Sequence, residues 1–374
     1  MKVESMRVQV WDYRAELEAE RPAIMEAIER VLASGRLILG DSVKHFETEF
    51  AAYCGSGFGV GVNSGTDALV LALLALGIKP GDEVITVPNT AIPTVSAIVS
   101  AGGMPRFVDI DPGTYLMDTS RLEAAITPRT RCIVPVHLFG QCVNMDDVNR
   151  VAAAHGLRVL EDCAQSHGAT FQGKVCGAIG DAAAFSFYPT KLLGGYGDGG
   201  MVVTKDEALA DHVRRLRMYG TNKTYYSIEH GFNSRLDELH AEMLRTKLPR
   251  LDGYIARRRE LAARYDARLS GTPLGLPQTA GGNVHAFYIY VVRHRQREVI
   301  MAALAERGVF VNISYPWPIH IMSGYRHLGY SAGDFPHTEQ AAQEIFSLPM
   351  YPALTDAEHD YVCEQLVDIL ARLG

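Results

Sequence analysis

A single lysine, Lys191, stands between an aromatic run and a glycine-rich turn in the stretch SFYPTKLLGGYGDGG, residues 186–200. A lysine in such a setting can hold a phosphate, carry a covalent intermediate, or simply be solvated at the tip of a loop. The sequence around it has to distinguish these three roles.

A carboxylate precedes this lysine. Asp162 lies in LEDCAQSHGA, residues 160–169, at the carboxyl end of an apolar run typical of a buried strand. Ligands bind at that edge of open α/β sheets. A buried carboxylate is costly unless it meets a positive or hydrogen-bonding group. Asp162 therefore indicates a site with a ligand partner, or else a helix cap or an internal salt bridge.

The third feature is the turn Ser64, Gly65 and Thr66, which leads from a strand pattern directly into a helix pattern. The free amides of a helix N-terminus attract phosphate, although the same residue types also serve as simple caps. Together with Lys191 and Asp162 the turn completes the set that pyridoxal phosphate (PLP) needs. Its aldehyde takes a lysine, its ring nitrogen a carboxylate and its phosphate a helix N-terminus.

Two other cofactor classes fit the sequence less well. A nucleotide-binding P-loop has its glycines before the lysine, whereas here they follow Lys191. A nicotinamide enzyme of the dinucleotide-binding fold needs GxGxxG opening a helix after the first strand, and the sequence has none. The PLP hypothesis remains.

Strand patterns alternate with helix patterns along the first two thirds of the chain. The alternation predicts strands at 58–63, 82–88 and 131–138, with helices at 66–77, 94–103 and 145–156. The runs 158–164 and 182–188 are apolar almost throughout, as strands buried on both faces are. We expect an α/β fold with a mostly parallel central sheet.

The remaining segments do not show this regular alternation of strand and helix patterns. We expect an N-terminal helix at 23–35, a long charged helix within 233–269, a strand at 284–292, and helices at 296–308 and 356–374. Two domains are predicted: a large α/β domain with the N-terminal helical segment, residues 1–250, and a small α+β domain, residues 251–374.

The amino-acid composition limits the classes of molecule that the protein is expected to bind. Lys plus Arg (36) against Asp plus Glu (43) gives a net charge of −7, with both signs spread along the chain. This balance argues against binding nucleic acid or a membrane surface and favours a small-molecule partner. The six cysteines lack zinc-like spacing, so no metal is expected. The N-terminal stretch has no apolar core of a signal peptide, and we expect a cytoplasmic protein.

These motifs occur together in one known family. NSGTDALVLAL, EDCAQSHGA, SFYPTK with GYGDGG, and NSRLDELHAEMLRTKL stand in this order. The sequence resembles the DegT/DnrJ/EryC1/StrS family of PLP-dependent nucleotide-sugar aminotransferases over almost its whole length. The resemblance implies the PLP-dependent transferase fold of the aspartate aminotransferase type, fold type I.

The resemblance also assigns roles. Lys191 would bind the cofactor covalently and then move a proton, while Asp162 would pair with the ring nitrogen. Asn233 would reach the phosphate of the neighbouring subunit's cofactor, which implies a homodimer with shared active sites. Tyr315 and His320 would face the substrate. The cofactor-binding positions implied are Gly65, Thr66, Asn89, Asp162, Gln165, Ser186, Lys191 and Asn233.

Two positions depart from the family's pattern. Leu192 stands where many relatives have an asparagine, so a polar contact from that side chain is lost. The place where relatives put an aromatic ring or a histidine over the cofactor falls near Asn89 or Ala91. No side chain for ring stacking is therefore identified.

The function implied is transfer of an amino group, from L-glutamate, to a keto group of a nucleotide-linked deoxysugar, with dTDP as the nucleotide. A 3-keto sugar is favoured over a 4-keto one. The pyridoxamine form (PMP) of the cofactor would carry the amino group between the two half-reactions. The alternatives are a regulatory PLP-binding protein without turnover, and a lyase or dehydratase of the same fold; relatives that act as sugar dehydratases have histidine in place of the lysine.

Overall fold

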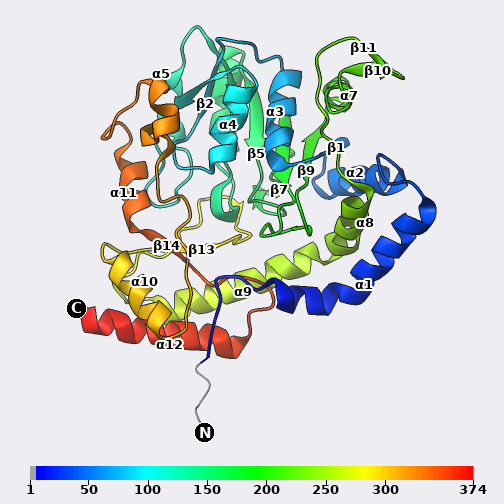
Figure 1. Cartoon of the computed structure of the whole chain (residues 1–374). Helices are drawn as coiled ribbons and strands as arrows, with labels where there is room; N and C mark the ends of the chain where they lie inside the picture. Colours follow the sequence, from blue (N-terminus) through cyan, green and yellow to red (C-terminus); the bar gives the residue numbers. More distant parts are fainter. Residues whose placement is uncertain (1–5, 374) are drawn as a thin grey trace.

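A seven-stranded sheet forms the centre of the larger part of the molecule, shown in the computed structural model of Figure 1. The structure describes residues 6–373. All neighbouring strands are parallel except at β9, which runs antiparallel to both β1 and β8. The mostly parallel sheet is thereby confirmed. In spatial order the strands are β1 Phe58–Val62, β9 Gly200–Thr204, β8 Ala182–Ser186, β5 Arg158–Asp162, β4 Thr130–Ile133, β2 Glu83–Thr86 and β3 Met104–Phe107.

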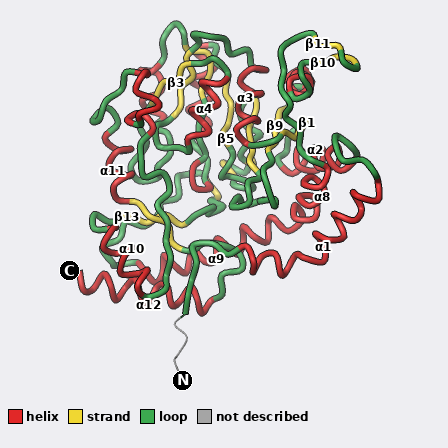
Figure 2. The backbone as a smooth tube through the Cα atoms, viewed as in Figure 1, coloured by secondary structure: helices red, strands yellow, loops and turns green. Residues whose placement is uncertain are grey.

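Both faces of this sheet are buried under helices, as Figure 2 shows. Successive strand residues point to opposite faces, so Val159 belongs to one apolar cluster and Leu160 to the other. This arrangement explains why the strands carry apolar residues almost without interruption. The helices of one face are α3 Gly65–Ala75, α4 Ile92–Ser100 and α7 Glu207–Leu216; those of the other are α2 Asp41–Tyr53, α6 Met145–His155 and α8 Glu238–Lys247.

The C-terminal elements gather around a third apolar cluster beside the sheet (Figure 1). Two antiparallel strands, β13 Tyr290–Arg293 and β14 Ile345–Leu348, pack there with three helices. These helices are α9 Leu251–Leu269, α10 Arg297–Glu306 and α12 Asp356–Leu373. The division into domains at residue 250 stays a prediction.

The N-terminal helix is longer than predicted. α1 spans Tyr13–Ser34, so it begins ten residues before the expected start at 23. Proline is common in the first turn of a helix and disfavoured in its interior. In the structure Asp12 caps the helix by accepting a hydrogen bond from the Arg14 amide at 2.9 Å, and Pro22 lies inside it.

Two other expectations were wrong in detail. The segment 233–269 is not one helix, because the chain narrows into a 3-10 turn at Leu248–Arg250, around Pro249, between α8 and α9. Nor is 284–292 one strand. Phe287 has φ 49°, in the left-handed region that interrupts an extended chain, and only residues from Tyr290 onward pair with β14.

The remaining elements are short, apart from α11 Pro336–Glu344. They are α5 Leu122–Ala125, β6 Thr170–Phe171, β7 Lys174–Val175, β10 Thr221–Lys223, β11 Tyr226–Ser227, β12 Asn283–Val284, and 3-10 turns at Thr119–Arg121, Leu138–Gly140, Ile319–Ile321 and Ser323–Leu328. Among residues 6–373, no helix combines the length and the apolar character needed to cross a bilayer.

Candidate active site

The predicted residues converge on a cavity of about 280 Å³ at the carboxyl edge of the sheet. The parallel strands β5 and β8 end beside each other there, at Asp162 and Ser186. The N-terminus of α3 faces the same space. Of the predicted site residues, those that line the cavity are Gly65, Thr66, Asp162, Gln165, Ser186 and Lys191.

The carboxylate of Asp162 is buried and held in a fixed orientation. The Thr94 hydroxyl donates to its Oδ2 at 2.7 Å, and the Ala164 amide donates to its Oδ1 at 3.1 Å. Thr90 bonds to Thr94 at 2.9 Å and so extends the chain of hydroxyls. Burial raises the pKa of Asp162, and the Thr94 hydrogen bond opposes that rise by stabilising the charged form.

The start of α3 presents free amides to the cavity. Ser64 caps the helix by accepting from the Asp67 amide at 3.1 Å. Within the described residues, the amides of Gly65 and Thr66 donate to no protein acceptor. Gly65 lies against β8, since a Cβ added there would stand 2.6 Å from the Ser186 Cβ. Only glycine fits this approach, and the result is an anion-binding cradle beside the Ser186 hydroxyl.

Gln165 is fixed by contacts at both ends of its amide. Its Oε1 accepts from the Phe139 amide at 2.9 Å, and its Nε2 donates to the Tyr315 hydroxyl. Tyr315 has φ 60°, an uncommon conformation for a tyrosine. The structure thus connects Tyr315 to the site through Gln165, although Tyr315 itself does not line the cavity.

Besides Tyr315, three predicted residues do not line this cavity: Asn89, His320 and Asn233. Asn89 is buried, and its Nδ2 has no partner among the described residues, whereas Ala91, two positions on, lines the cavity. His320 is buried against Phe335 and bonds to Glu339 at 3.0 Å. Asn233 is exposed. The roles predicted for Asn89, His320 and Asn233 stay predictions.

Sequence patterns missed two residues next to the predicted ones. Thr94 supports Asp162 from 68 positions away, and Tyr288 places its ring 4.8 Å from the Nζ of Lys191. A threonine in a helix and a tyrosine before a strand are both ordinary residues. No local signal distinguishes them, because their partners are brought near only by the fold.

A buried cluster of potential metal ligands includes Glu161 and Cys163, the two residues that flank Asp162 in the chain. Ligand atoms of His137, Cys142 and Cys176 lie within 4.8 Å of one another, as do those of His137, Glu161 and Cys163. Spacing along the chain did not indicate this grouping. Both His137 nitrogens are already engaged, Nδ1 by the Val143 amide at 3.1 Å and Nε2 by Glu161 at 2.9 Å. The expectation that the chain holds no metal stays a prediction.

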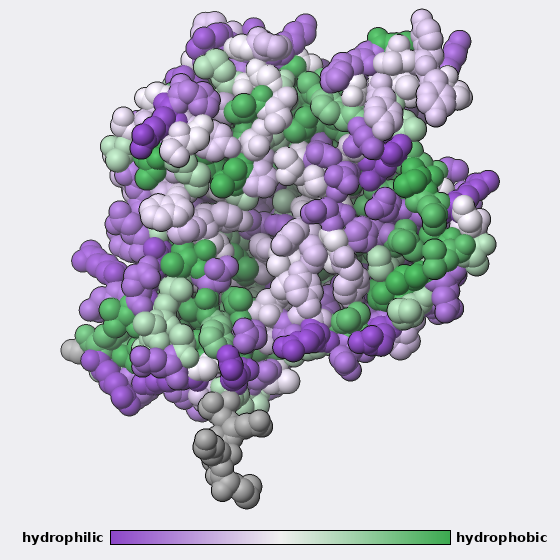
Figure 3. Space-filling model, in the orientation of Figure 1, coloured by the Kyte–Doolittle hydropathy of each residue, from purple (hydrophilic) through white to green (hydrophobic). Residues whose placement is uncertain are grey.

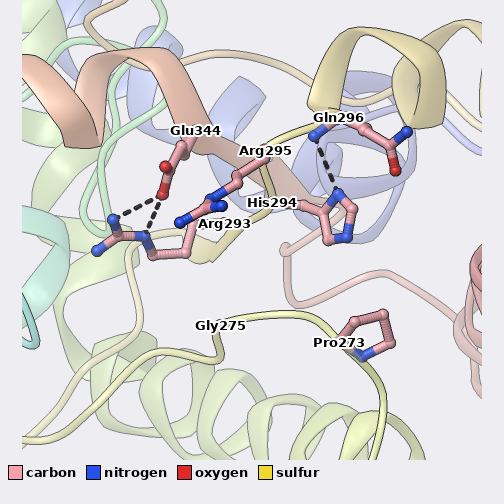
Figure 4. Close-up of a pocket in the computed structure, with 7 residues that line it drawn as sticks. All are labelled: Pro273, Gly275, Arg293, His294, Arg295, Gln296 and Glu344. Atoms are coloured by element: carbon pink, nitrogen blue, oxygen red, sulfur yellow. Dashed lines mark hydrogen bonds and ion pairs between the residues drawn. The ribbon is translucent and has the colours of Figure 1, made fainter. Parts of the chain in front are cut away.

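A larger cavity of about 490 Å³ lies elsewhere, between the end of β13 and the end of α11 (Figure 4). Arg293 bonds to Glu344 there at 2.6 Å, and the Gln296 amide donates to His294 at 3.1 Å. These contacts engage Arg293, Glu344 and His294 with one another or with the adjacent backbone. It shares no lining residue with the Lys191 cavity, and it has neither a lysine nor a buried carboxylate for PLP chemistry.

The sequence pattern of the DegT/DnrJ/EryC1/StrS aminotransferase family matches residues 18–367. The chain belongs to this family. It is therefore an aminotransferase, and the resemblance noted from its motifs is confirmed.

Individual members of the family are close to it. A dTDP-3-amino-3,4,6-trideoxy-alpha-D-glucose transaminase of Micromonospora megalomicea subsp. nigra is 52% identical, with 98% of this chain and 100% of the relative covered. The structure of S. venezuelae DesV, solved with a ketimine intermediate, superposes with a TM-score of 0.96 at 42% identity, over 98% of this chain and 100% of DesV. NtdA from Bacillus subtilis, solved with bound cofactor PMP, has a TM-score of 0.88 at 32% identity. The match covers 94% of this chain and 82% of the NtdA chain. The predicted fold is confirmed.

The residues of this aminotransferase fit PLP. One cavity is lined by the buried carboxylate of Asp162, the anion-binding cradle at Gly65 with its two free amides, and the amine of Lys191. Each matches one functional part of the cofactor. The family and its solved members imply the same cofactor.

Proposed function

We propose that this aminotransferase moves an amino group from L-glutamate to the 3-keto group of a dTDP-linked deoxysugar. The name of the relative at 52% identity, a transaminase of dTDP-3-amino-3,4,6-trideoxy-alpha-D-glucose, supports the sugar, the nucleotide and the position. The observation that carries the reaction itself is the convergence of Lys191, Asp162 and the α3 N-terminus on one cavity.

Each residue has a task at a stated atom. When bound, PLP supplies an electron sink that makes a proton on the neighbouring carbon acidic. Lys191 Nζ would hold the cofactor and would later move that proton between carbons. Asp162 would keep the ring nitrogen protonated, with Thr94 fixing its Oδ2. The amides of Gly65 and Thr66 and the Ser186 hydroxyl would hold the phosphate, and Gln165 would contact the ring's hydroxyl.

The proposed role of the anion-binding cradle in holding the PLP phosphate can be tested directly. Gly65→Ala would push a methyl group into Ser186, whose Cβ lies 2.6 Å from that position. We expect PLP affinity to fall at least about tenfold and the folded state to lose roughly 1–3 kcal/mol, the usual cost of overpacking. Cofactor titration by fluorescence and thermal melting measure the two effects.

Gly253→Ala is the matched control, because nothing lies within 4 Å of a Cβ added at that helical position. It should bind PLP as the parent does and gain up to roughly 1 kcal/mol of stability. Normal PLP affinity in Gly65→Ala would remove the cradle from the proposal.

We further propose that two chains share each active site. Ser234 points inward, donating to Asp67 at 2.7 Å, while its neighbour Asn233 in this extended segment is exposed. The exposed side chain of Asn233 can therefore contact the active site of a second copy of the chain. Apolar side chains on α1 and the turn into α2, Met25, Leu32, Leu37 and Ile38, are exposed, and Figure 3 shows a hydrophobic patch over this region. Such a patch favours association with another chain.

Complementation tests the shared site. Lys191→Ala and Asn233→Ala should each be strongly impaired as homodimers. A purified mixed dimer should regain about half of the parent activity, because one of its two sites combines an intact lysine from one chain with an intact asparagine from the other. A mixed dimer no more active than either homodimer would place both residues in a single-chain site.

The substrate is tested with a panel of nucleotide-linked sugars carrying 3-keto or 4-keto groups, each assayed with L-glutamate and with other amino-acid donors. The proposal expects the highest kcat/KM for a dTDP-linked 3-keto deoxysugar with glutamate. A preference for a 4-keto sugar or another donor would overturn the corresponding part.

A further inference from the structure

The side chain of Lys191 faces an aromatic ring from a distant part of the chain. Its Nζ stands over the ring of Tyr288, 4.8 Å from the ring centroid. The Tyr288 hydroxyl lies 3.0 Å from that of Thr190, the residue before the lysine. Tyr288 thus contacts the lysine through its ring and the adjoining residue through its hydroxyl.

The backbone that carries Tyr288 is docked tightly on the site. The Tyr288 amide donates to the Phe139 carbonyl at 3.0 Å, and the Ala286 amide donates to the Gly140 carbonyl at 2.8 Å. A Cβ added to Gly140 would stand 2.7 Å from the Tyr288 nitrogen, so glycine is required there. Phe287, between the two anchored residues, has φ 49°. Non-glycine residues persist in this region only where their surroundings hold them.

A buried arginine secures the same segment from the other side. Arg258 in α9 donates through Nη1 to the Tyr288 carbonyl at 2.9 Å and to the Met350 carbonyl at 2.7 Å. Among residues 6–373 no carboxylate lies within ion-pair distance of it, although Glu16 lies near enough to favour its charged form. Burial lowers the pKa of Arg258 to about 10. Burying a cation without a paired carboxylate costs free energy of folding unless hydrogen bonds compensate. The guanidinium of Arg258 directs one of its hydrogen bonds to the backbone that positions Tyr288.

We propose that Tyr288 is a positioning residue that holds the amino group of Lys191 in the site whenever that group is not bonded to the cofactor. This inference rests on the proposed function, in which Lys191 is released during each half-reaction and must then move a proton. An ammonium group is attracted to the face of an aromatic ring. The bond to Thr190 fixes the plane of the ring, so a long, flexible side chain stays near the reacting carbons.

The first test measures the placement directly in cofactor-free protein. Lysines are reductively methylated with ¹³C-formaldehyde, and the Lys191 signal is identified by its loss in Lys191→Arg. We expect this signal to be displaced upfield by the tyrosine ring. Tyr288→Phe should retain most of the displacement and Tyr288→Leu should abolish it. If Tyr288→Leu does not fold, Tyr288→Met, an unbranched side chain, replaces it. An unchanged Lys191 signal without the aromatic ring would overturn the proposal.

The second test is kinetic. In Tyr288→Leu we expect kcat to fall about tenfold with KM within about twofold of the parent, since substrate binding is untouched while proton transfer is slowed. Tyr288→Phe should recover at least about half of kcat. Tyr361→Leu is the control: that half-buried tyrosine also makes one hydrogen bond, to the Arg307 carbonyl, but lies on α12. A rise in KM alone, or the same loss in the control, would overturn the role.

The two tests separate this inference from the proposed function. If the parent enzyme transfers no amino group from glutamate, the proposed function fails, while the methyl signal still reports whether Tyr288 holds Lys191. If the parent transaminates and Tyr288→Leu matches it, the inference alone fails.

Discussion

Lys191→Ala is expected to lose transamination and covalent attachment of the cofactor together. Both depend on the same Nζ, which bonds to PLP and moves the proton. The kcat should therefore fall by at least about 10³-fold, within the range that positioned acid–base groups contribute. Borohydride reduction of the PLP-loaded chain, followed by mass spectrometry, should show the added cofactor mass in the parent and none in the variant.

The variant should keep its fold. Among the described residues the Lys191 Nζ contributes no hydrogen bond or ion pair, so its removal costs little stability. Lys44→Ala, which removes an exposed lysine of α2, controls for loss of a charge and should behave as the parent does in both assays. Cofactor fixed to the Lys191→Ala chain by borohydride would show that another lysine bonds to PLP.

Asp162→Asn should bind PLP and yet react slowly. The amide has the shape of the carboxylate and can keep the hydrogen bond from the Ala164 amide. It would not keep the ring nitrogen of PLP protonated, so the cofactor would withdraw electrons from the reacting carbon less effectively. We expect kcat to fall at least about 100-fold, equivalent to about 2.7 kcal/mol, as measured in single-turnover reactions with glutamate.

Asp211→Asn makes the same chemical change on the exposed face of α7 and should leave kcat unchanged. Thermal melting separates a slow enzyme from an unfolded one. Turnover of Asp162→Asn within about twofold of the parent, or roughly 0.4 kcal/mol, would remove this carboxylate from the mechanism.

Much of the fold could be predicted because its strands are buried on both faces. The run 158–164 is largely apolar because its successive side chains pack on opposite faces of the sheet. Val159 belongs to the apolar cluster on one face and Leu160 to the cluster on the other. One prediction went wrong because a single backbone angle decides the structure there. Nothing in the period-2 pattern of 284–292 indicates that Phe287 adopts φ 49°, since the contacts that hold it come from Gly140 and its neighbours.

The site could be predicted only in part, for a related reason. Lys191, Asp162 and Gly65 stand at turns and strand ends, where spacing along the chain carries chemical information. Thr94 and Tyr288 contact Asp162 and Lys191 from positions without a motif, and only the packed structure shows these contacts. Asn233 lies outside the cavity of its own chain, so a single chain leaves its role a prediction.

The measurement that bears most directly on the central claim is the absorbance of the PLP-loaded enzyme after L-glutamate is added without a keto acceptor. An aminotransferase completes half of its reaction under these conditions. The visible band of bound PLP should give way to the near-ultraviolet band of PMP, with one equivalent of 2-oxoglutarate released for each site, and Lys191→Ala should release none. A protein that takes up no PLP, or a PLP-loaded enzyme whose spectrum is unchanged by glutamate and every other amino-acid donor, would contradict the account.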